Sequence, residues 1–376
     1  MPGPLDGVRI IEMAGIGPGP FCGMMLADHG AEVIRVERPG PVSATFRDVM
    51  GRSRKSIVVD VKKPGAVDVI RDLCRGADGL IEGYRPGVME RLGLGPDVLL
   101  ADNPKLVYGR MTGWGQTGPM SQAAGHDLNY ISLSGALYAM GAADEKPPIP
   151  LNLVGDFGGG GMMLAFGMVS AILSARGTGR GQVVDCAMAE GAAVLAAMFY
   201  SMIGSKIWDG SRGTNVLSGA SPFYGVYQTS DGEFVSLGSL EPQFYAELLK
   251  RTGLSEDEDF QHQNDRAFWP AMQAKLTALF RTKSRDQWRA VMEGSDVCFA
   301  PVMSMQEAPS HPHNVARGAF VEAFGIVQPA PTPRYSESQT TPPSYTEKGA
   351  DADAVLADAG LSADRIAELR AAGVVG

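Results

Sequence analysis

Residues 8–37 read VRIIEMAGIGPGPFCGMMLADHGAEVIRVE, and they carry the clearest fold signal in the chain. Two apolar runs, residues 8–14 and 31–37, have the length and composition of strands. A glycine-rich turn and a helical segment separate them. A strand, a helix and a second strand in this order predict a parallel pair joined by a crossover helix. The stretch therefore predicts a Rossmann-like open α/β sheet.

The same alternation continues along the first half of the chain. Strand-like runs occupy residues 56–62, 79–84 and 105–115, and helical segments lie between them. We therefore assign residues 1–200 to one large α/β domain.

Two apolar stretches in this half raise the question of a membrane. Glycines interrupt residues 158–175, and Glu190 interrupts residues 187–204, so neither stretch is an unbroken span of about 20 strongly apolar residues. We expect both to form buried core helices, and we expect no membrane partner.

A change of pattern predicts a second, smaller domain over residues 225–315. Two strand-like runs flank Asp231 and Gly232, a dipeptide that is typical of a tight hairpin turn. Two helical stretches follow them, so this region is expected to be a small α+β unit.

The segments around the small domain have the composition of linkers. Residues 201–224 are polar and rich in Gly and Ser, and residues 316–345 are rich in proline, which excludes a continuous helix or central strand. The chain ends in two short helical segments, the second with Ser362 as a predicted N-cap. We expect residues 330–376 to complete the large domain.

The composition excludes some classes of partner. The 376 residues include 42 acidic and 33 basic side chains, and a formal charge of -9 does not suit a nucleic-acid-binding protein. The four cysteines lie far apart and form no CxxC pair, so neither a metal site nor a disulfide framework is expected. The N-terminus has no basic segment leading into an apolar run, and we expect a cytoplasmic protein.

The glycine-rich turn after the first strand imitates a dinucleotide-binding motif but departs from it. Gly15 and Gly17 stand where that motif requires glycine, whereas its third position is Pro20. Arg38 directly follows Glu37 at the end of the second strand, and a cation there favours a phosphate over a free ribose hydroxyl. A phosphorylated ligand is therefore a stronger interpretation than NAD or FAD.

Basic side chains are frequent in the sequence near this turn. Each one alone can be a solvated surface residue, but the set can bind several phosphates of an anionic small molecule. The set comprises Arg35, Arg38, Arg52, Arg54, Lys55, Lys62, Arg85 and Arg91.

Residues 123–137, AAGHDLNYISLSGAL, place two ionisable groups at the front of a helical segment. His126 can exchange a proton near neutral pH, although a buried structural histidine is an alternative. Asp127 is a natural N-cap. A helix that begins there directs its free N–H groups forward, where they can stabilise a developing oxyanion.

Two further carboxylates are candidates for acid/base chemistry. Asp156 stands at a strand-like end before four glycines, where a bulky ligand can approach and partial burial would raise its pKa. Glu241 precedes Pro242 at a predicted helix start and could orient an imidazole. Each also has a purely structural interpretation, as a helix cap or a helix-terminus charge.

Long segments of the chain are similar to one known family, and together they cover nearly all of it. The chain resembles the α-methylacyl-CoA racemases, a branch of the family III CoA-transferase superfamily. The matching segments include the GHD of residues 125–127 and the VGDFGGG of residues 154–160. The others are residues 5–40, 51–62, 82–95, 181–192, 223–245 and 298–308.

The resemblance implies an isomerase of lipid metabolism that inverts the 2-methyl centre of a CoA thioester by 1,1-proton transfer. Two bases act on opposite faces of that carbon, and the family's bases match His126 and Asp156. The family's donor to the enolate oxygen matches the backbone N–H of Asp127, and Glu241 matches the acidic partner of the histidine. No cofactor and no metal is implied, because coenzyme A is part of the substrate.

The resemblance also implies how the substrate and a second copy of the chain bind. The implied fold is an interlocked homodimer, whose active sites are shared between the large domain of one subunit and the small domain of the other. Ile16 and Tyr130 match positions along the pantetheine or acyl path. The implied phosphate and adenine contacts of the CoA are Arg38, Arg52, Lys62, Arg85 and Arg91.

Two other functions remain open on the sequence alone. A CoA-transferase of the same superfamily would use Asp127 as a nucleophile toward an acyl-CoA, moving the CoA to a carboxylic acid. Transferases generally carry a different residue before that aspartate, so His126 favours the racemase. In a noncatalytic CoA-binding protein the acid/base pair would be incidental, and the joint presence of His126, Asp156 and Glu241 disfavours this.

Overall fold

The computed structural model describes residues 2–41 and 47–376, and the chain divides into two compact units. Unit 1 carries the N-terminal α/β region and unit 2 carries the region after residue 200. Unit 1 comprises Met1–Ser134, Pro150–Ala196 and Gly318–Gly376, and unit 2 comprises Gly135–Ile149 and Ala197–Arg317.

The unit bounds differ from the predicted domains in two respects. Residues 201–224, predicted as a linker, lie within unit 2, and the second difference concerns the predicted large domain. Gly135–Ile149 falls within the predicted large domain but belongs to unit 2. It packs there because the Arg212 guanidinium donates a hydrogen bond to the Ala143 carbonyl at 3.0 Å and lies over the Tyr138 ring. Contacts of this kind, between segments far apart in sequence, leave no trace in local composition.

A six-stranded parallel sheet runs through unit 1 in the order β3-β2-β1-β4-β5-β6. This confirms the predicted α/β class, and the order reverses between β1 and β4 as in a doubly wound Rossmann fold. The sixth strand was not predicted, because its short sequence VVDCA includes an acidic residue and leads directly into a helix. The strands are β1 (Arg9–Met13), β2 (Glu32–Glu37), β3 (Lys55–Val58), β4 (Gly79–Glu82), β5 (Val107–Thr112) and β6 (Val183–Ala187).

Helices cover both faces of this sheet, and each face has its own hydrophobic core. Neighbouring residues such as Ile10 and Ile11 lie in different cores, because successive side chains of a strand point to opposite faces. On one face pack α2 (Ala66–Arg75), α3 (Val88–Arg91), α4 (Pro96–Asp102), α13 (Ala352–Asp358) and α14 (Ala363–Ala371). On the other pack α1 (Pro18–Asp28), α5 (Asp127–Leu133), α6 (Met163–Thr178) and the start of α7 (Met188–Leu195).

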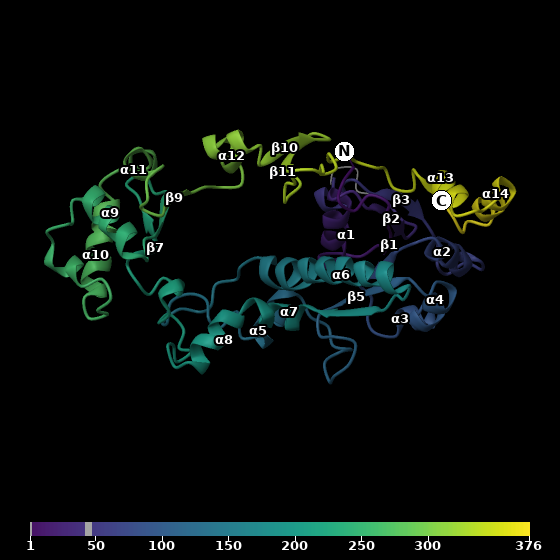
Figure 1. The fold of residues 1–376 in the computed structure, drawn as a ribbon, viewed down its shortest axis with the longest axis horizontal. Helices are drawn as coiled ribbons and strands as arrows, with labels where there is room; N and C mark the ends of the chain where they lie inside the picture. The colour runs from purple at the N-terminus through teal and green to yellow at the C-terminus, as the bar shows by residue number, and fades with distance from the viewer. Residues whose placement is uncertain (1, 42–46) are drawn as a thin grey trace. The chain divides into compact units, whose positions relative to one another are not determined.

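The C-terminal residues belong to unit 1. Figure 1 shows α13 and α14 in yellow beside α2 and β3, although they are separated from these elements by most of the chain. Val375 pairs with Val59 in an isolated antiparallel bridge, and the Ser362 hydroxyl caps α14 by accepting from the Arg365 N–H at 3.2 Å.

The predicted linker over residues 316–345 contains regular structure. Strands β10 (Phe320–Ala323) and β11 (Ile326–Pro329) form an antiparallel hairpin in its first half. The prediction followed the prolines, and most of these lie after the hairpin, in a segment without helix or strand. Local composition therefore obscured two short strands.

The glycine-rich segment before α6 is a π-helix, η2 (Leu153–Met162), and not the strand end that the sequence suggested for Asp156. It continues into α6, and among the described residues Leu153–Thr178 is the one helical span long and apolar enough to cross a membrane. One side of α6 is core, as expected, with Leu164 and Met168 fully buried. The other side is exposed, and Phe166 is 74% accessible in this chain.

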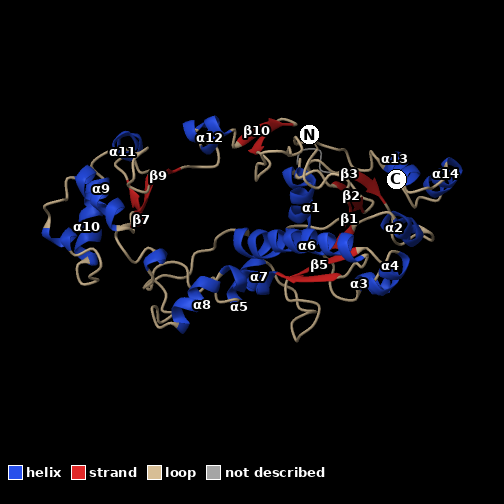
Figure 2. Ribbon diagram, viewed as in Figure 1, coloured by secondary structure: helices blue, strands red, loops and turns tan. Residues whose placement is uncertain are grey.

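Unit 2 combines a small sheet with several helices. Its strands β7 (Tyr224–Gln228), β8 (Phe234–Gly238) and β9 (Phe299–Val302) form an antiparallel sheet, and Gly232 takes a φ of 83° in the turn between the first two. Figure 2 shows the strands of this unit in red beside its helices. The helices of unit 2 are α8 (Ala197–Gly204), α9 (Pro242–Thr252), α10 (Trp269–Phe280), α11 (Arg285–Met292) and α12 (Pro312–Arg317). The short 3-10 helices of the chain are Val49–Gly51, Val216–Ser218, Glu258–Gln261 and Ala308–Ser310.

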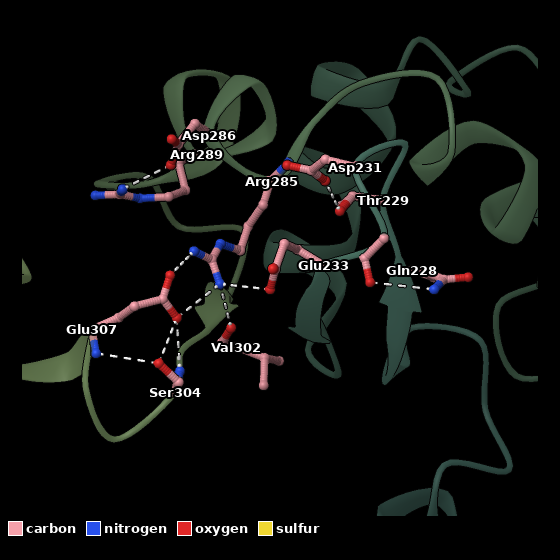
Figure 3. Close-up of polar contacts among 11 residues, drawn as sticks. Gln228, Thr229, Asp231, Glu233, Arg285, Asp286, Arg289, Val302, Ser304 and Glu307 are labelled. Carbon is pink, nitrogen blue, oxygen red and sulfur yellow. Dashed lines mark hydrogen bonds and ion pairs between the residues drawn. The ribbon is translucent and has the colours of Figure 1, made fainter.

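An arginine at the start of α11 holds one end of this small sheet together (Figure 3). The Arg285 guanidinium donates to Glu233 at 3.1 Å, to the Val302 carbonyl at 3.0 Å and to the carboxylate of Glu307. Glu307 also accepts from the backbone N–H and the hydroxyl of Ser304, both at 2.9 Å. These hydrogen bonds hold the pKa of the Glu307 carboxyl down at about 2.

Candidate active site

A cavity of about 1250 Å³ lies in unit 1 at the carboxyl ends of the strands. Its walls come from the loops that follow β1, β2, β4 and β5, together with the N-terminus of α5 and the π-helix. It therefore includes the reversal point between β1 and β4, which is where open parallel sheets bind their ligands.

The glycine-rich turn after β1 forms one wall of this cavity. Gly17 takes a φ of 68°, a conformation that favours glycine, and a Cβ there would lie 3.1 Å from Oδ2 of Asp156. Pro18 occupies the first position of α1, where the missing N–H costs nothing. The turn therefore brings backbone close to an acidic side chain, and Ile16 at its tip is 85% exposed.

His126 stands at the N-terminus of α5 and lines the cavity. The helix starts one residue later, at Asp127, so His126 and not Asp127 is the N-cap residue. Asn129 fixes this start because its side-chain oxygen accepts from the His126 N–H at 3.0 Å. The His126 side chain is exposed in this chain, which excludes the alternative of a buried structural histidine.

Asp127 turns away from the cavity and into the protein. Its residue is 5% exposed, and its Oδ1 accepts a hydrogen bond from the backbone N–H of Asp156 at 2.7 Å. Its Oδ2 is also buried and has no hydrogen-bond partner among the described residues. The backbone N–H of Asp127 belongs to the first turn of α5 and so has no acceptor within the helix.

Asp156 lies on the π-helix, and its side chain lines the same cavity as His126. Its Oδ2 accepts from the Asn152 amide at 3.1 Å. Burial raises the pKa of its carboxyl, the Asn152 hydrogen bond opposes this shift, and the negative charge of Asp127 adds to it. A carboxylate that is destabilised in this way is a better proton acceptor than an ordinary aspartate.

The glycine run after Asp156 allows the π-helix to pack tightly against its neighbours. A Cβ on Gly159 would lie 2.5 Å from the backbone nitrogen of Ala192 in α7, and one on Gly161 would lie 2.9 Å from the Pro18 carbonyl in α1. Side chains at these positions would push the π-helix away from both helices. The run therefore fixes the backbone that carries Asp156, and π-helical turns of this kind are frequent at functional sites.

Basic and aromatic side chains line the rest of the cavity. Arg38 and Arg85 both reach it, and the Arg38 guanidinium lies over the Tyr84 ring at 5.0 Å. Tyr130 and Ile16, both predicted from the sequence, line it too. The cavity thus combines two proton-transfer groups, two guanidinium groups and apolar wall, which suits a large anionic ligand with an apolar part. Residues 2–41 and 47–376 contain no cluster of three His, Cys, Asp or Glu side chains placed to hold a metal ion.

Comparison with known proteins assigns this arrangement to a family. The model of CoA-transferase family III matches residues 5–349. The chain belongs to that family. It is 43% identical to α-methylacyl-CoA racemase of Mus musculus over 99% of this chain and 97% of the relative, and 41% identical to the Homo sapiens racemase over 97% and 96%. A CAIB/BAIF family protein from Brucella suis has a similar structure, with a TM-score of 0.82 and 26% identity over 96% of this chain and all of that one.

Three of the CoA contacts implied by the family resemblance do not line the cavity. Arg52 is buried and committed elsewhere, because it donates to Asp28 at 2.9 and 2.5 Å and to the Gln328 side chain at 2.9 Å. In this chain it joins α1 to the β10–β11 hairpin and has no free donor face for a phosphate. Lys62 and Arg91 are exposed surface residues.

Lys348 is a cavity residue of this family III chain that sequence reasoning missed. Its ammonium donates to the Gly40 carbonyl at 3.2 Å, beside the loop that carries Arg38. It is far from the other cavity residues in sequence and lies just after the proline-rich segment of residues 316–345. No sequence motif marks this lysine.

Glu241 belongs to unit 2. It is the N-cap residue of α9, directly after the sheet, and its own side chain makes no capping hydrogen bond. Burial and the charge of Glu241 both raise the pKa of the nearby Cys298 thiol. The Glu241 side chain is exposed.

Proposed function

We propose that this chain is an isomerase that interconverts (2R)- and (2S)-2-methylacyl-CoA thioesters by two-base proton transfer. The observation that carries the proposal is that His126 and Asp156 line one cavity, in a family III chain whose relatives include two α-methylacyl-CoA racemases. A racemase needs two proton-transfer groups at one carbon. A single base would return the proton to the face from which it came.

The chemistry follows from what these groups can hold and release. One base removes the α-proton, and the electron pair of the C–H bond moves toward the thioester carbonyl to form an enolate. The free N–H of Asp127 at the start of α5 is the proposed donor to the enolate oxygen. The second group, which carries a proton, delivers it to the opposite face, so one proton is lost and one is gained.

The surroundings of Asp156 make it a stronger base than an ordinary aspartate. Histidine and aspartate differ in pKa by about 2.6 units in water. Burial and the charge of Asp127 raise the pKa of Asp156, toward the range that is ordinary for a histidine. A smaller difference lets either residue accept the proton when the substrate has the corresponding configuration.

The CoA part of the substrate is proposed to bind along the cations of the cavity. Arg38, Arg85 and Lys348 line the cavity, and Arg52 is left out because its donors are taken by Asp28 and Gln328. Phosphate groups are recognised by guanidinium and ammonium groups of this kind. Tyr130 and Ile16 are the proposed wall for the pantetheine and acyl parts.

We also propose that the chain works as a homodimer whose partner brings Glu241 to His126. Exposed apolar side chains on α6 and α7 support a covered surface, since Phe166, Leu173 and Val194 are 74%, 73% and 60% accessible. Light scattering after gel filtration should give twice the chain mass. A monomeric mass, or flotation of the protein with lipid vesicles, would contradict the dimer.

CoA transfer is the second candidate, and the position of Asp127 speaks against it. A transferase would need this carboxylate to attack the thioester. Here it is 5% exposed, and one of its oxygens is bound to the Asp156 N–H. A nucleophile in that position would have to break this contact and turn toward the cavity before it could react.

One experiment separates the two functions. The protein is incubated with (2S)-2-methylacyl-CoA in deuterated water, and both α-deuterium incorporation and configuration are followed. We expect deuterated (2R) product without any acceptor acid. Turnover that requires a carboxylate acceptor would instead establish the transferase.

A further inference from the structure

We infer that the side chain of Asp127 is a positioning residue, which holds the π-helical turn that aims the Asp156 carboxylate into the cavity. The inference rests on the proposed function and adds a role for a side chain that the two-base chemistry does not use. It concerns the carboxylate of Asp127 and not its backbone N–H.

A hydrogen bond connects the Asp127 side chain to the backbone of Asp156. Oδ1 of Asp127 accepts the backbone N–H of Asp156 at 2.7 Å, and this bond joins the first turn of α5 to the π-helix. The two bases therefore stand on segments that are tied together by one hydrogen bond. His126 precedes Asp127 in sequence, and Asp156 carries the bonded N–H.

The Asp127 carboxylate also packs against the backbone of the π-helix. A Cβ on Gly155 would lie 2.5 Å from Oδ1 of Asp127 and 3.1 Å from the Ile131 side chain, so the carboxylate lies directly against the π-helix backbone. Glycine at residue 155, immediately before Asp156, leaves room for this carboxylate. Removal of the carboxylate would leave both a space and an unpaired N–H at this point.

Burial of the Asp127 carboxylate lowers the stability of the folded chain. A buried carboxylate with an oxygen that lacks a partner is unfavourable for stability, and Oδ2 of Asp127 has none among the described residues. A neutral side chain would fold at lower cost. The charge is explained if it serves Asp156, whose titratable neighbours are Asp127, His126 and Tyr130.

Asp127→Ala and Asp127→Asn test the inference with both substrate enantiomers in deuterated water. In Asp127→Ala, inversion should fall about 10²-fold, since a small displacement of a reacting group has this effect. Exchange of the α-proton without inversion should persist for one enantiomer, because His126 keeps its place. Asp127→Asn retains an acceptor for the Asp156 N–H and should recover most of the inversion rate.

The charge gives a second readout that a merely structural role would not change. Asp127→Asn removes a negative charge beside Asp156, so the pKa of Asp156 should fall and the acidic limb of kcat/KM should move to lower pH. An equal loss of exchange and inversion in Asp127→Ala, no recovery in Asp127→Asn, or an unmoved acidic limb would each overturn the inference.

A matched control and a readout free of activity complete the test. The Asp78 carboxylate also accepts a backbone N–H, that of Arg9 at 2.9 Å, but at the amino end of the sheet. Asp78→Ala should lower stability and leave the ratio of exchange to inversion unchanged. Hydrogen–deuterium exchange of residues 153–162 should accelerate in Asp127→Ala and remain slow in Asp127→Asn; unchanged protection would overturn the inference even if the chain proved not to be a racemase.

Discussion

The carboxylate of Asp156 at the cavity of unit 1 and the carboxylate of Glu307 in unit 2 are the same chemical group in opposite settings. Glu307 is held by Arg285 and Ser304, and its pKa lies at about 2. Asp156 has one side-chain donor, Asn152, and burial and a neighbouring carboxylate raise its pKa. The first arrangement stabilises the ionised form and the second destabilises it.

The difference separates polar groups that support the fold from those that are kept ready to react. In the Arg285 network the guanidinium donates to two carboxylates and a backbone carbonyl, so the charges add to stability and are not available for chemistry. In unit 1 an oxygen of the buried Asp127 carboxylate has no hydrogen-bond partner among the described residues, and the His126 side chain is exposed at the cavity. Substitutions in the two regions should therefore differ in kind.

The largest effect is expected at the two proposed bases. Asp156→Asn and His126→Gln keep size and polarity but remove the proton acceptor, so kcat for inversion should fall by about 10²–10⁴-fold. The unfolding midpoint should change little, and in Asp156→Asn it should rise, because a destabilised charge is removed. Chiral analysis of the product together with thermal unfolding checks both. Either variant at full activity would contradict the two-base assignment.

The next largest effect is expected on KM, when a cationic side chain of the cavity is removed. Lys348 lines the cavity and is bonded to a single backbone carbonyl, unlike Arg285 with its carboxylate partners. Lys348→Met should raise KM for the CoA thioester about 10-fold, as expected for the loss of one charge-assisted contact of about 1.5 kcal/mol. The increase in KM should vanish with the corresponding pantetheine thioester, which lacks the phosphates.

Lys105 provides the control for this prediction, since it is an exposed lysine outside the cavity. Lys105→Met should leave KM unchanged for both substrates. An equal rise in KM for the CoA and pantetheine thioesters in Lys348→Met would show that the lysine does not bind a phosphate.

The sequence was sufficient for the parts of the fold that repeat a local pattern. The order of strand and helix from β1 to β5 follows from short apolar runs and the segments between them, and the hairpin follows from Asp231 and Gly232. Helix starts were located to within one residue at α5 and α14. In each case the deciding contacts lie within a few residues of one another.

The parts that could not be predicted depend on contacts between distant segments. The π-helix at Asp156 packs closely against α1 and α7 because glycines face both helices. These helices lie about 130 and 30 residues from Asp156 in the sequence, so no local pattern predicts the contact. The same holds for Arg52, whose partners are Asp28 and Gln328, and for Lys348. Sequence alone supplies the type of each side chain but not what lies beside it.

A smaller effect, on stability alone, is expected in unit 2. Arg285→Met removes a 12%-exposed guanidinium from several acceptors and should cost about 2–3 kcal/mol. Trp208, Trp269 and Trp288 lie in this unit and Trp114 lies in unit 1, so urea unfolding followed by tryptophan fluorescence reports mainly on unit 2. Arg289, on the same helix and 24% exposed, is the control, and Arg289→Met should cost only about 0.5 kcal/mol. Equal costs would contradict a special role for Arg285.

The smallest effect is a pH dependence that should appear in unit 2. Because the pKa of Glu307 is lowered in the folded chain to about 2, its contribution is complete above its ordinary pKa and is lost as the pH falls from about 5 toward 2. The difference in urea midpoint between the unaltered chain and Glu307→Gln should therefore shrink between pH 7 and pH 3. In the Arg285→Met background this pH dependence should largely disappear, because the guanidinium is its main cause. A difference that grows as the pH falls would mean that Glu307, like Asp156, is destabilised by its surroundings, and the contrast between the two carboxylates would be lost.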